Sequence, residues 1–204
     1  MGAINKLAFV FIPNSINSHD GLFEIENSFC IISLLILFSS PGGISYRQER
    51  IGKNGIAFNL YKFRSMRIDA DQLGSLTVGM KDPRITSIGI FIRKYKLDEF
   101  PQFINVLVGD MSIVGPRPEV GEFVALYSDV QKKVLEVKPG ITDYASIEYF
   151  NENELLASSD NPKKTYVEKI MPDKIKINQK YLANPTLAHD LKIIFLTIRK
   201  VLNN

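Results

Sequence analysis

The stretch LDEFPQFINVLVGD, residues 97–110, combines two adjacent acids with an apolar pattern of helical spacing. Pro101 suits the first turn of a helix, so we expect Asp98 to be the N-cap, where exposed N–H groups favour negative charge. Gly109 is typical of the residue just past a helix C-terminus. The sequence therefore predicts an amphipathic helix between them. Its apolar stripe consists of Phe100, Phe103, Ile104 and Leu107.

The two acids have a structural and a chemical explanation. Taken alone, an Asp-Glu pair at a helix start is more often an N-cap followed by a second acid that favours the helix dipole. Adjacent side chains on a helix point about 100° apart, so one carboxylate could attack a substrate while the other holds a metal. Arg93 and Lys94 lie about one turn upstream. Cations beside a carboxylate pair favour phosphoryl chemistry, which uses cations and Mg²⁺ to neutralise phosphate.

On the N-terminal side of this stretch, the sequence predicts a hairpin. Asn54-Gly55 is the dipeptide expected of a tight turn, between extended segments at Ile44–Tyr46 and Ala57–Phe63. Alternation places Lys62 and Arg64 on one face, either as phosphate contacts or as charges that protect an exposed edge strand. Around the hairpin, we expect a break at residues 40–43, an irregular loop with at most a short helix at Arg67–Lys81, and a helix after Pro83.

On the C-terminal side, residues 115–118 (GPRP) predict a rigid loop. The prolines fix the backbone on both sides of Arg117, which suits a bidentate grip on phosphate. The alternative is a structural turn in which Arg117 pairs with Glu119. Beyond the loop, we expect a helix at Glu119–Val137, a turn at Pro139-Gly140, an extended segment at Ile141–Tyr149, and helices at Lys163–Leu182 and Leu187–Leu202.

The composition sets broad limits on the fold and on any metal site. A length of 204 residues fits one domain, with or without a short appendage, and 45% hydrophobic residues can build a core. Cys30 is the single cysteine, so the chain cannot form an internal disulfide. With only two histidines besides, it cannot build a His/Cys zinc cage, and a hard cation held by carboxylates and phosphates is the better expectation. The net charge is small, but basic residues concentrate at Arg47–Arg67 and Lys81–Lys96, which suits phosphates.

The first forty residues differ from the rest of the chain. The apolar run Phe29–Phe38 would extend roughly 15 Å as a helix, whereas spanning a bilayer takes about 20 apolar residues. We therefore expect a core helix, an interfacial helix or one limb of a re-entrant element. Acids precede the run, and it lies too far into the chain for a cleavable signal peptide.

A set of motifs in fixed order resembles the bacterial sugar transferase family, the monotopic phosphoglycosyl transferases. Any one motif is weak, but this many in order is specific, and they cover about Phe29 to the C-terminus. In chain order they are Ser40-Pro41-Gly42, residues 47–52 (RQERIG), residues 61–66 (YKFRSM), residues 82–86 (DPRIT), residues 97–102 (LDEFPQ), residues 105–107 (NVL), residues 109–118 (GDMSIVGPRP) and residues 138–142 (KPGIT).

The resemblance implies a reaction and a set of roles. Asp98 would be the nucleophile that attacks the sugar-linked phosphate of a UDP-sugar, expels UMP and carries a covalent phosphosugar. Polyprenyl phosphate (undecaprenyl phosphate) would then accept that group, and Glu99 would hold Mg²⁺. The contacts to phosphate and nucleotide would be Lys62, Arg64, Arg84, Arg93 and Arg117.

The resemblance also implies a fold, a location and partners. We expect an α/β fold, with a small sheet surrounded by several helices, amphipathic helices at a membrane surface and an apolar N-terminal segment of the re-entrant type. Residues 1–40 would be that membrane-associated segment and residues 41–204 the catalytic domain. The expected site is the cytoplasmic face of the bacterial inner membrane, as the first membrane step of exopolysaccharide, capsule, O-antigen or glycoprotein glycan assembly. Downstream glycosyltransferases are expected partners, and nucleic acid is not.

Two positions depart from the family pattern. The re-entrant helix of the family breaks near its middle at Ser-Pro, but no proline is present near Asn27-Ser28, and the first limb, within Gly2–Glu26, holds several charges. Charges at membrane depth cost about 2–3 kcal/mol each. We therefore expect an altered N-terminus, for example through a frameshift or a wrong start site; tight, salt-resistant membrane binding would refute this. Asp143 stands where the family often has glycine, and the sequence assigns no function to it.

Other classes of protein remain as alternatives. A basic module that binds nucleic acid or anionic lipid explains the cations, but two acids beside them would repel a polyanion unless a metal intervened. An inactive, membrane-associated relative would fit the altered N-terminus but not the intact Asp98-Glu99 pair. Another Mg²⁺-dependent phosphotransfer enzyme would not release UMP from UDP-sugars.

Overall fold

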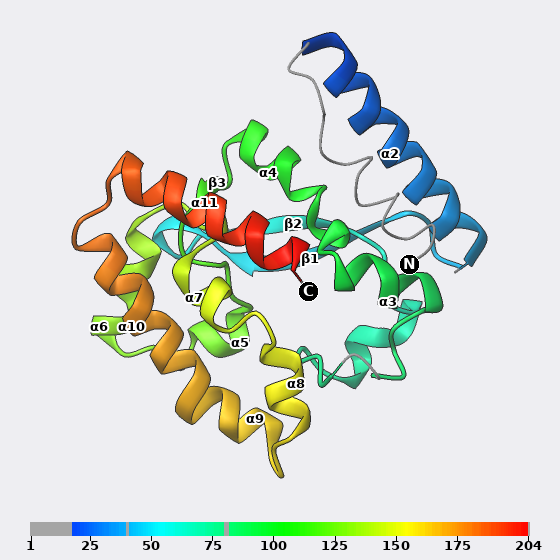
Figure 1. Cartoon of the computed structure of the whole chain (residues 1–204). Helices are drawn as coiled ribbons and strands as arrows, with labels where there is room; N and C mark the ends of the chain where they lie inside the picture. The colour runs from blue at the N-terminus through cyan, green and yellow to red at the C-terminus, as the bar shows by residue number, and fades with distance from the viewer. Residues whose placement is uncertain (1–17, 40, 80–81, 204) are drawn as a thin grey trace.

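The computed structural model describes residues 18–39, 41–79 and 82–203 (Figure 1). The strands are β1 (Ser45–Ile51), β2 (Ala57–Phe63), β3 (Ser112–Val114) and β4 (Gly140–Thr142). The longer helices are α2 (Ser18–Ser39), α3 (Ser87–Lys94), α4 (Gln102–Val108), α10 (Met171–Leu182) and α11 (Leu187–Leu202). The shorter ones are α5 (Gly121–Val124), α6 (Asp129–Lys132), α7 (Tyr144–Glu148), α8 (Glu152–Ala157) and α9 (Pro162–Thr165), with 3₁₀ turns at Lys53–Gly55, Ile68–Leu73, Leu97–Glu99 and Lys133–Glu136.

The predicted hairpin is confirmed. β1 and β2 pair antiparallel, with Ser45 opposite Phe63 and Ile51 opposite Ala57. Asn54 and Gly55 adopt positive φ angles of 56° and 76° in the turn between them, as this dipeptide favours. β1 is longer than expected, because pairing continues from Ser45 to Ile51.

The predicted α/β fold with several helices is confirmed, but the described part of the chain has two small sheets where one was expected. β3 and β4 form a second, parallel pair in which Ser112 lies opposite Gly140 and Val114 opposite Thr142. The backbones then approach very closely, since a Cβ atom on Gly140 would lie 2.1 Å from the nitrogen of Gly115. Glycine is therefore required at this contact, which brings the loop after β3 against the start of β4.

Helix α4 is present as predicted and ends at Gly109, which has a φ of 91°, but it is packed with its polar face inward. Gln102 and Asn105 are fully buried, while Phe103, Ile104 and Leu107 are exposed. The Asn105 side chain accepts from the Tyr61 N–H at 3.0 Å and donates to the Asn59 carbonyl at 2.8 Å. It thus satisfies backbone groups of β2 on the edge that β1 does not cover.

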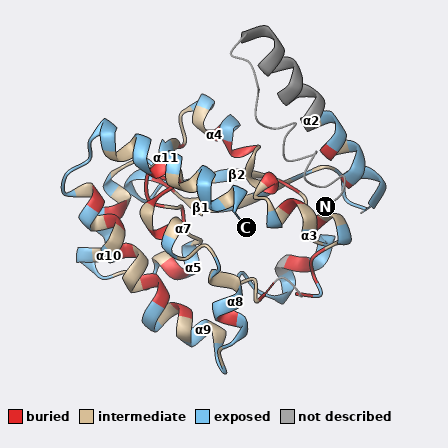
Figure 2. Ribbon diagram, in the orientation of Figure 1, coloured by how far each residue is buried: buried red, intermediate tan, exposed pale blue. Residues whose placement is uncertain are grey.

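Two apolar clusters hold the fold together (Figure 2). One cluster joins α5, α8 and α10 and contains Phe123, Val134, Leu156, Tyr166, Ile170, Met171 and Ile175. The other joins α2 to α3 and β2, and contains Ile32, Ile36, Phe63, Ile92 and Leu97. Each fully buried side chain of this size contributes about 1.5–3 kcal/mol. The second cluster contains Leu97 and so fixes the backbone directly before Asp98.

Three predicted boundaries are wrong. Asp98 is no N-cap: it lies in the 3₁₀ turn Leu97–Glu99, and α4 begins only after Pro101. The segment Ile141–Tyr149 is extended only to Thr142, because the Asp143 side chain accepts from the Ser146 N–H and caps α7. The helix expected at Glu119–Val137 is divided into short turns, because Ser128 and Gln131 form a capping box that starts α6.

The C-terminal helices follow the prediction with one irregularity. Leu187–Leu202 is α11 with the expected bounds. Lys163–Leu182 is helical but consists of α9, a π-helical turn at Tyr166–Ile170, and α10. Pro172, which lacks an N–H, lies two residues after the π turn, and such a turn accommodates the missing hydrogen bond.

The N-terminal segment is described from Ser18 onward, as one helix through Ser39, so most of the predicted first limb lies outside the described residues. The side chains Ile32 and Ile36 of this helix pack on α3 and β2. Across the described residues, we find no helix whose length and hydrophobicity would let it cross a membrane.

Candidate functional site

A cavity of about 1430 Å³ opens beside the acidic turn, by which we mean residues Leu97–Glu99. β2 contributes Lys62 to its wall, α3 contributes Arg93, and the loop after β3 contributes Arg117. Side chains of α7, α10 and the end of α11 close the opposite side. The cavity therefore gathers both acids and all five predicted phosphate contacts from segments far apart in the sequence.

The backbone of the acidic turn is unusual. Lys96 adopts a left-handed conformation, with φ 55° and ψ 20°, directly before the turn. Leu97 is anchored in the apolar cluster next to α3. Asp98 is only 5% exposed, and its Oδ1 has no hydrogen-bond partner among the described residues. A buried carboxylate oxygen without a partner is costly, which is typical of a group kept for chemistry.

The two carboxyls of the turn have opposite electrostatics. Burial, and next the charge of Glu99, raise the pKa of Asp98 above its ordinary value, against the opposing effects of Lys62, Arg93 and Lys96. Burial alone would also raise the pKa of Glu99, but Arg117, Lys96 and Lys62 outweigh it and hold that pKa well below the usual range. The pair thus contains one firmly ionised acid and one whose charge is poorly compensated.

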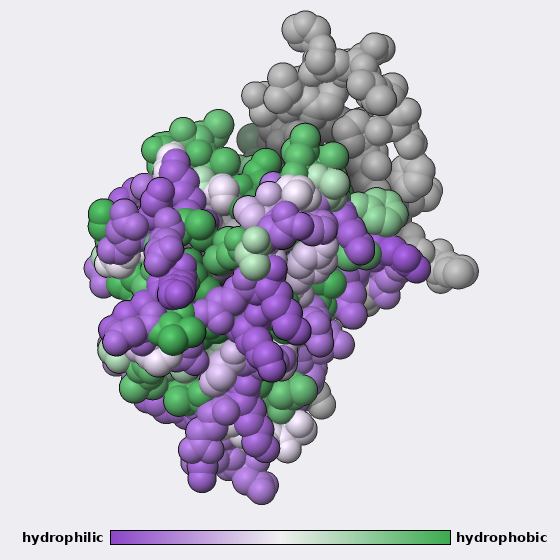
Figure 3. Space-filling model, turned by 90° about the vertical axis from the view of Figure 1, so that its left-hand side faces the viewer, coloured by the Kyte–Doolittle hydropathy of each residue, from purple (hydrophilic) through white to green (hydrophobic). Residues whose placement is uncertain are grey.

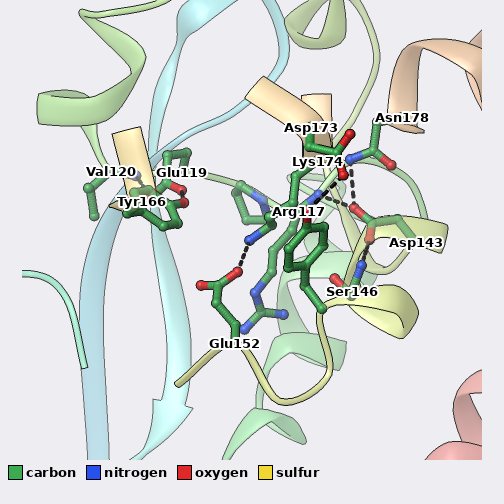
Figure 4. Close-up of polar contacts among 12 residues, drawn as sticks. Arg117, Glu119, Val120, Asp143, Ser146, Glu152, Tyr166, Asp173, Lys174 and Asn178 are labelled. Atoms are coloured by element: carbon green, nitrogen blue, oxygen red, sulfur yellow. Dashed lines mark hydrogen bonds and ion pairs between the residues drawn. The ribbon is translucent and has the colours of Figure 1, made fainter. Parts of the chain in front are cut away.

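Arg117 pairs with Glu99 and not with Glu119. Its Nη1 lies 3.0 Å from Glu99 Oε2 and its Nη2 lies 2.5 Å from Glu99 Oε1, a bidentate pair that raises the Arg117 pKa. Glu119 instead pairs with Arg50 at 3.1 Å and accepts from the Tyr166 hydroxyl. The alternative of a local turn closed by Arg117 and Glu119 is therefore wrong (Figure 4).

Lys62 and Arg93 both act electrostatically on Asp98 in the acidic turn. Burial, and next the repulsion of Arg117, lower the pKa of Lys62 to about 7. Arg93 Nη1 lies 3.5 Å from the Ser65 hydroxyl and has no ion pair among the described residues. Both cations line the cavity, so both can receive an anionic ligand there.

The other two predicted contacts have partners elsewhere. Arg64 lines the cavity but donates to the carbonyls of Gly43 and Ser45, at 3.1 and 3.2 Å. Arg84 is buried, forms an ion pair with Asp82 at 2.7 Å and donates to the carbonyls of Ala70, Gly74 and Leu76. It organises the loop before it and also lines the cavity, and its role as a substrate contact is what the family resemblance implies.

Sequence reasoning missed several polar residues of the cavity. Asn178 and the ion pair of Lys174 with Glu152, 2.6 Å apart, come from α10 and α8 and line its wall. Asp143 lies behind Arg117, and its carboxylate accepts from the Arg117 N–H at 2.9 Å (Figure 4). One signal was available: aspartate is a favoured N-cap residue, and Asp143 directly precedes α7. The long-range contacts gave no signal in the sequence.

This arrangement can perform one kind of chemistry well. A buried carboxylate with an unpartnered oxygen can attack a phosphorus atom, and nearby cations can hold the phosphate oxygens. Within the described residues, no three His, Cys, Asp or Glu side chains lie together as a metal cage. The buried carboxylates and the cations that line the cavity give the site the character of a phosphate-ester site with carboxylate chemistry.

Comparison with known proteins places the chain in a family. The family model described as "Bacterial sugar transferase" matches residues 16–204. The chain therefore belongs to the bacterial sugar transferase family, as its motifs predicted.

Curated relatives agree with this assignment. The UDP-glucose:undecaprenyl-phosphate glucose-1-phosphate transferase of Escherichia coli (strain K12) is 36% identical over 182 residues, which are 88% of this chain and 37% of that protein. The UDP-N-acetylgalactosamine-undecaprenyl-phosphate N-acetylgalactosaminephosphotransferase of Aeromonas hydrophila is 36% identical over 83% of this chain and 38% of its own length. The exopolysaccharide production protein PSS of Rhizobium leguminosarum bv. phaseoli is 36% identical over 89% of both chains. The chain spans between a third and a half of the first curated relatives that it matches.

Proposed function

We propose that this protein transfers a sugar 1-phosphate from a UDP-sugar to undecaprenyl phosphate and releases UMP, as the first membrane step of a polysaccharide or glycan pathway. The observation that carries the proposal is the pair of opposite carboxyls in the acidic turn: Asp98 with an unpartnered oxygen, and Glu99 held by Arg117. Relatives whose names state this reaction support it.

In the first half-reaction, a carboxylate oxygen of Asp98 attacks the phosphorus that carries the sugar. The bond from that phosphorus to the UMP oxygen breaks, and UMP leaves with the bonding electron pair. Asp98 then carries the phosphosugar as an acyl phosphate. The negative charge of Asp98 is poorly stabilised by its surroundings, which favours this step. The attack moves that charge onto a phosphate held by Lys62, Arg93 and Arg117.

In the second half-reaction, a phosphate oxygen of undecaprenyl phosphate attacks the same phosphorus and displaces the Asp98 carboxylate. The product is a polyprenyl-diphosphate sugar, and the enzyme returns to its starting state. Because the phosphosugar passes through a covalent intermediate, we expect ping-pong kinetics. The cavity of about 1430 Å³ is large enough for a nucleotide sugar, which UMP release would vacate for the lipid phosphate.

The residues fit a magnesium ion of the kind that phosphate substrates bring with them. Mg²⁺ is usually bound through one or two carboxylates together with substrate phosphates and water. The unpartnered Oδ1 of Asp98 offers one donor, and Glu99, whose two oxygens accept from Arg117, would supply a second by giving up part of that pair. When bound there, the ion would neutralise charge on the transferring phosphate.

Exposed apolar side chains support docking on a membrane surface. We define the docking face as the exposed apolar residues of α4 and α11. α11 exposes Leu187, Leu191, Phe195, Ile198 and Leu202 at helical spacing, and α4 exposes Phe103, Ile104, Leu107 and Val108. Both helices contact β3, and Figure 3 shows hydrophobic side chains gathered toward the upper edge of the molecule, where α4 lies in Figure 1. Exposed apolar helix faces of this kind suit a lipid surface, where an acceptor lipid would be found.

The proposal is tested by UMP release from a panel of UDP-sugars with Mg²⁺, detergent and undecaprenyl phosphate. We expect one sugar to support turnover, Asp98→Asn to abolish it, and Asp129→Asn, which changes an exposed carboxylate, to leave it unchanged. Absence of UMP with every sugar, both here and after a membrane-inserting helix is placed before Phe29, would contradict the proposal.

A further inference from the structure

Asp143 is a fully buried carboxylate behind Arg117, with an exposed fraction of 0% (Figure 4). Three N–H donors from three segments converge on it. The Ser146 N–H donates to Oδ1 at 2.5 Å, and the Arg117 N–H and the Asn178 side chain donate to Oδ2, each at 2.9 Å. The carboxylate thus joins the start of α7, the middle of α10 and the loop that carries Arg117.

Capping α7 does not by itself explain a buried charge. Serine, threonine or asparagine caps a helix about as well, without the cost of removing an ion from water. The full set of donors does need a carboxylate, because both of its oxygens only accept. An asparagine would direct its own NH₂ group at one of the donors and leave that donor without an acceptor.

Other segments hold the loop that Asp143 contacts through its carbonyls: the Gly140 N–H donates to the Pro116 carbonyl at 3.0 Å, and Arg50 donates to the Pro118 carbonyl at 3.2 Å. Pro116 and Pro118 have no backbone N–H, so Arg117 supplies the only one in this three-residue stretch. That N–H donates to Asp143, and at the other end of the same residue the guanidinium binds Glu99. Arg117 is therefore held at both ends by acids, one of which belongs to the acidic turn.

We infer that Asp143 is a positioning residue: by accepting the Arg117 N–H, it fixes the loop so that the guanidinium meets Glu99 beside Asp98. Asn178 in turn fixes Asp143 from α10. The charge of Asp143 adds to this effect, since Glu99 first and Asp143 to a smaller degree raise the pKa of Arg117. Asp143 touches no substrate in this scheme and acts through Arg117 alone.

Amide hydrogen exchange tests the hydrogen bond from the Arg117 N–H to Asp143, here called the tether, without any assumption about the reaction. Because the two prolines have no N–H, deuterium gained by residues 116–118 reports Arg117 alone. In the full chain, we expect exchange at Arg117 to become at least about tenfold faster in Asp143→Asn and Asp143→Ser. Serine can still cap α7, so this variant separates the cap from the tether. Asp129→Asn is the matched control and should exchange as the parent does. Unchanged exchange in both Asp143 variants would overturn the inference.

A double-mutant cycle tests the consequence for turnover, and this arm rests on the proposed function. For UMP release, Asp143→Ser should lower kcat/KM about tenfold when Arg117 is present and less than about twofold in an Arg117→Ala background. Equal losses in both backgrounds would mean that Asp143 supports the fold in general, and would overturn the inference. If the parent releases no UMP, the proposed function fails, and the exchange result still decides whether Asp143 holds Arg117.

Discussion

The acidic turn and helix α4 are neighbours in the chain, and both bury polar side chains, but they treat them in opposite ways. In α4, Asn105 is completely buried and exchanges hydrogen bonds with two backbone groups of β2. In the acidic turn, Asp98 is nearly as deeply buried, and its Oδ1 has no partner among the described residues.

This difference separates a structural polar residue from a functional one. A buried amide with both of its groups satisfied stabilises the strand it contacts, whereas a buried carboxylate with an unsatisfied oxygen costs stability. We therefore expect changes at Asn105 to be read in the free energy of unfolding and changes at Asp98 to be read in turnover. The following predictions test that separation, beginning with the largest effect.

Replacing Asp98 with asparagine should affect turnover and stability in opposite directions. Loss of the nucleophile should lower kcat for UMP release by at least about 10⁴-fold. At pH 7 the same change should stabilise the fold by about 2 kcal/mol, raising the midpoint of thermal unfolding by about 5 °C, because it removes a buried charge. Enzyme assays and calorimetry on the same preparations measure both effects.

The pH dependence of this stabilisation provides a control. The pKa of Asp98 is raised in the folded state, so its ionisation costs stability only above the pKa of the unfolded state, about 4. Near pH 3 the parent carboxyl is neutral in both states, and the difference in unfolding midpoint should disappear. A variant that is equally active, or less stable at pH 7, would break the comparison.

Replacing Asn105 with leucine should destabilise the fold by about 3 kcal/mol, measured by urea unfolding. The change leaves the Tyr61 N–H and the Asn59 carbonyl without partners at the edge of β2. Val108→Asn makes the reverse exchange on the exposed face and should stay within about 0.5 kcal/mol of the parent. If Asn105→Leu were as stable as the parent, the buried amide would not be structural.

Lys62 should give the reaction a falling limb at alkaline pH. Its pKa is about 7, and only the ammonium form attracts phosphate, so kcat/KM should fall by up to about tenfold per pH unit above that value. Lys62→Arg keeps its charge and should lose the fall. A parent profile that stays level to pH 9 would show that the Lys62 charge does not matter for binding.

The smallest effect on the fold is expected on the outer face of α4. Leu107 is 86% exposed, so Leu107→Glu should change the free energy of unfolding by less than about 0.5 kcal/mol. Binding to vesicles of anionic phospholipid should weaken about fivefold, because a charge enters the docking face. Cosedimentation with the vesicles measures this binding. Lys132→Glu, at an exposed position on α6 outside the docking face, is the control for charge alone. Equal binding by parent and Leu107→Glu would exclude α4 from membrane docking.

Local patterns predicted much of the secondary structure. The Asn54-Gly55 turn and the bounds of α11 follow from residues within a few positions of each other. The orientation of α4 could not be predicted, because periodicity shows that a helix has two faces but not which face the core accepts. Here the uncovered edge of β2 selects the polar face, and no pattern within α4 records that edge.

The site was predicted in its residues but not in its connections. The acids and most of the cations were found from motifs, and they line one cavity. The pairing of Arg117 with Glu99 joins residues 18 positions apart, whereas the sequence suggested only the local Glu119 as a partner. Asp98 was misplaced as an N-cap because Pro101 fits a helix start, whereas the left-handed Lys96 begins a separate 3₁₀ turn.

The π-helical turn at Tyr166–Ile170 sets the rotational phase of everything that follows it in α10. A π turn amounts to one residue inserted into an α-helix, and one residue corresponds to about 100° of rotation. Deleting a single residue from this turn would leave a regular helix of nearly the same length, yet Lys174 and Asn178 would turn away from Glu152 and Asp143. One inserted residue thus determines which side chains of α10 face the cavity. Relatives that lack it must line the same cavity with side chains from other positions of the helix.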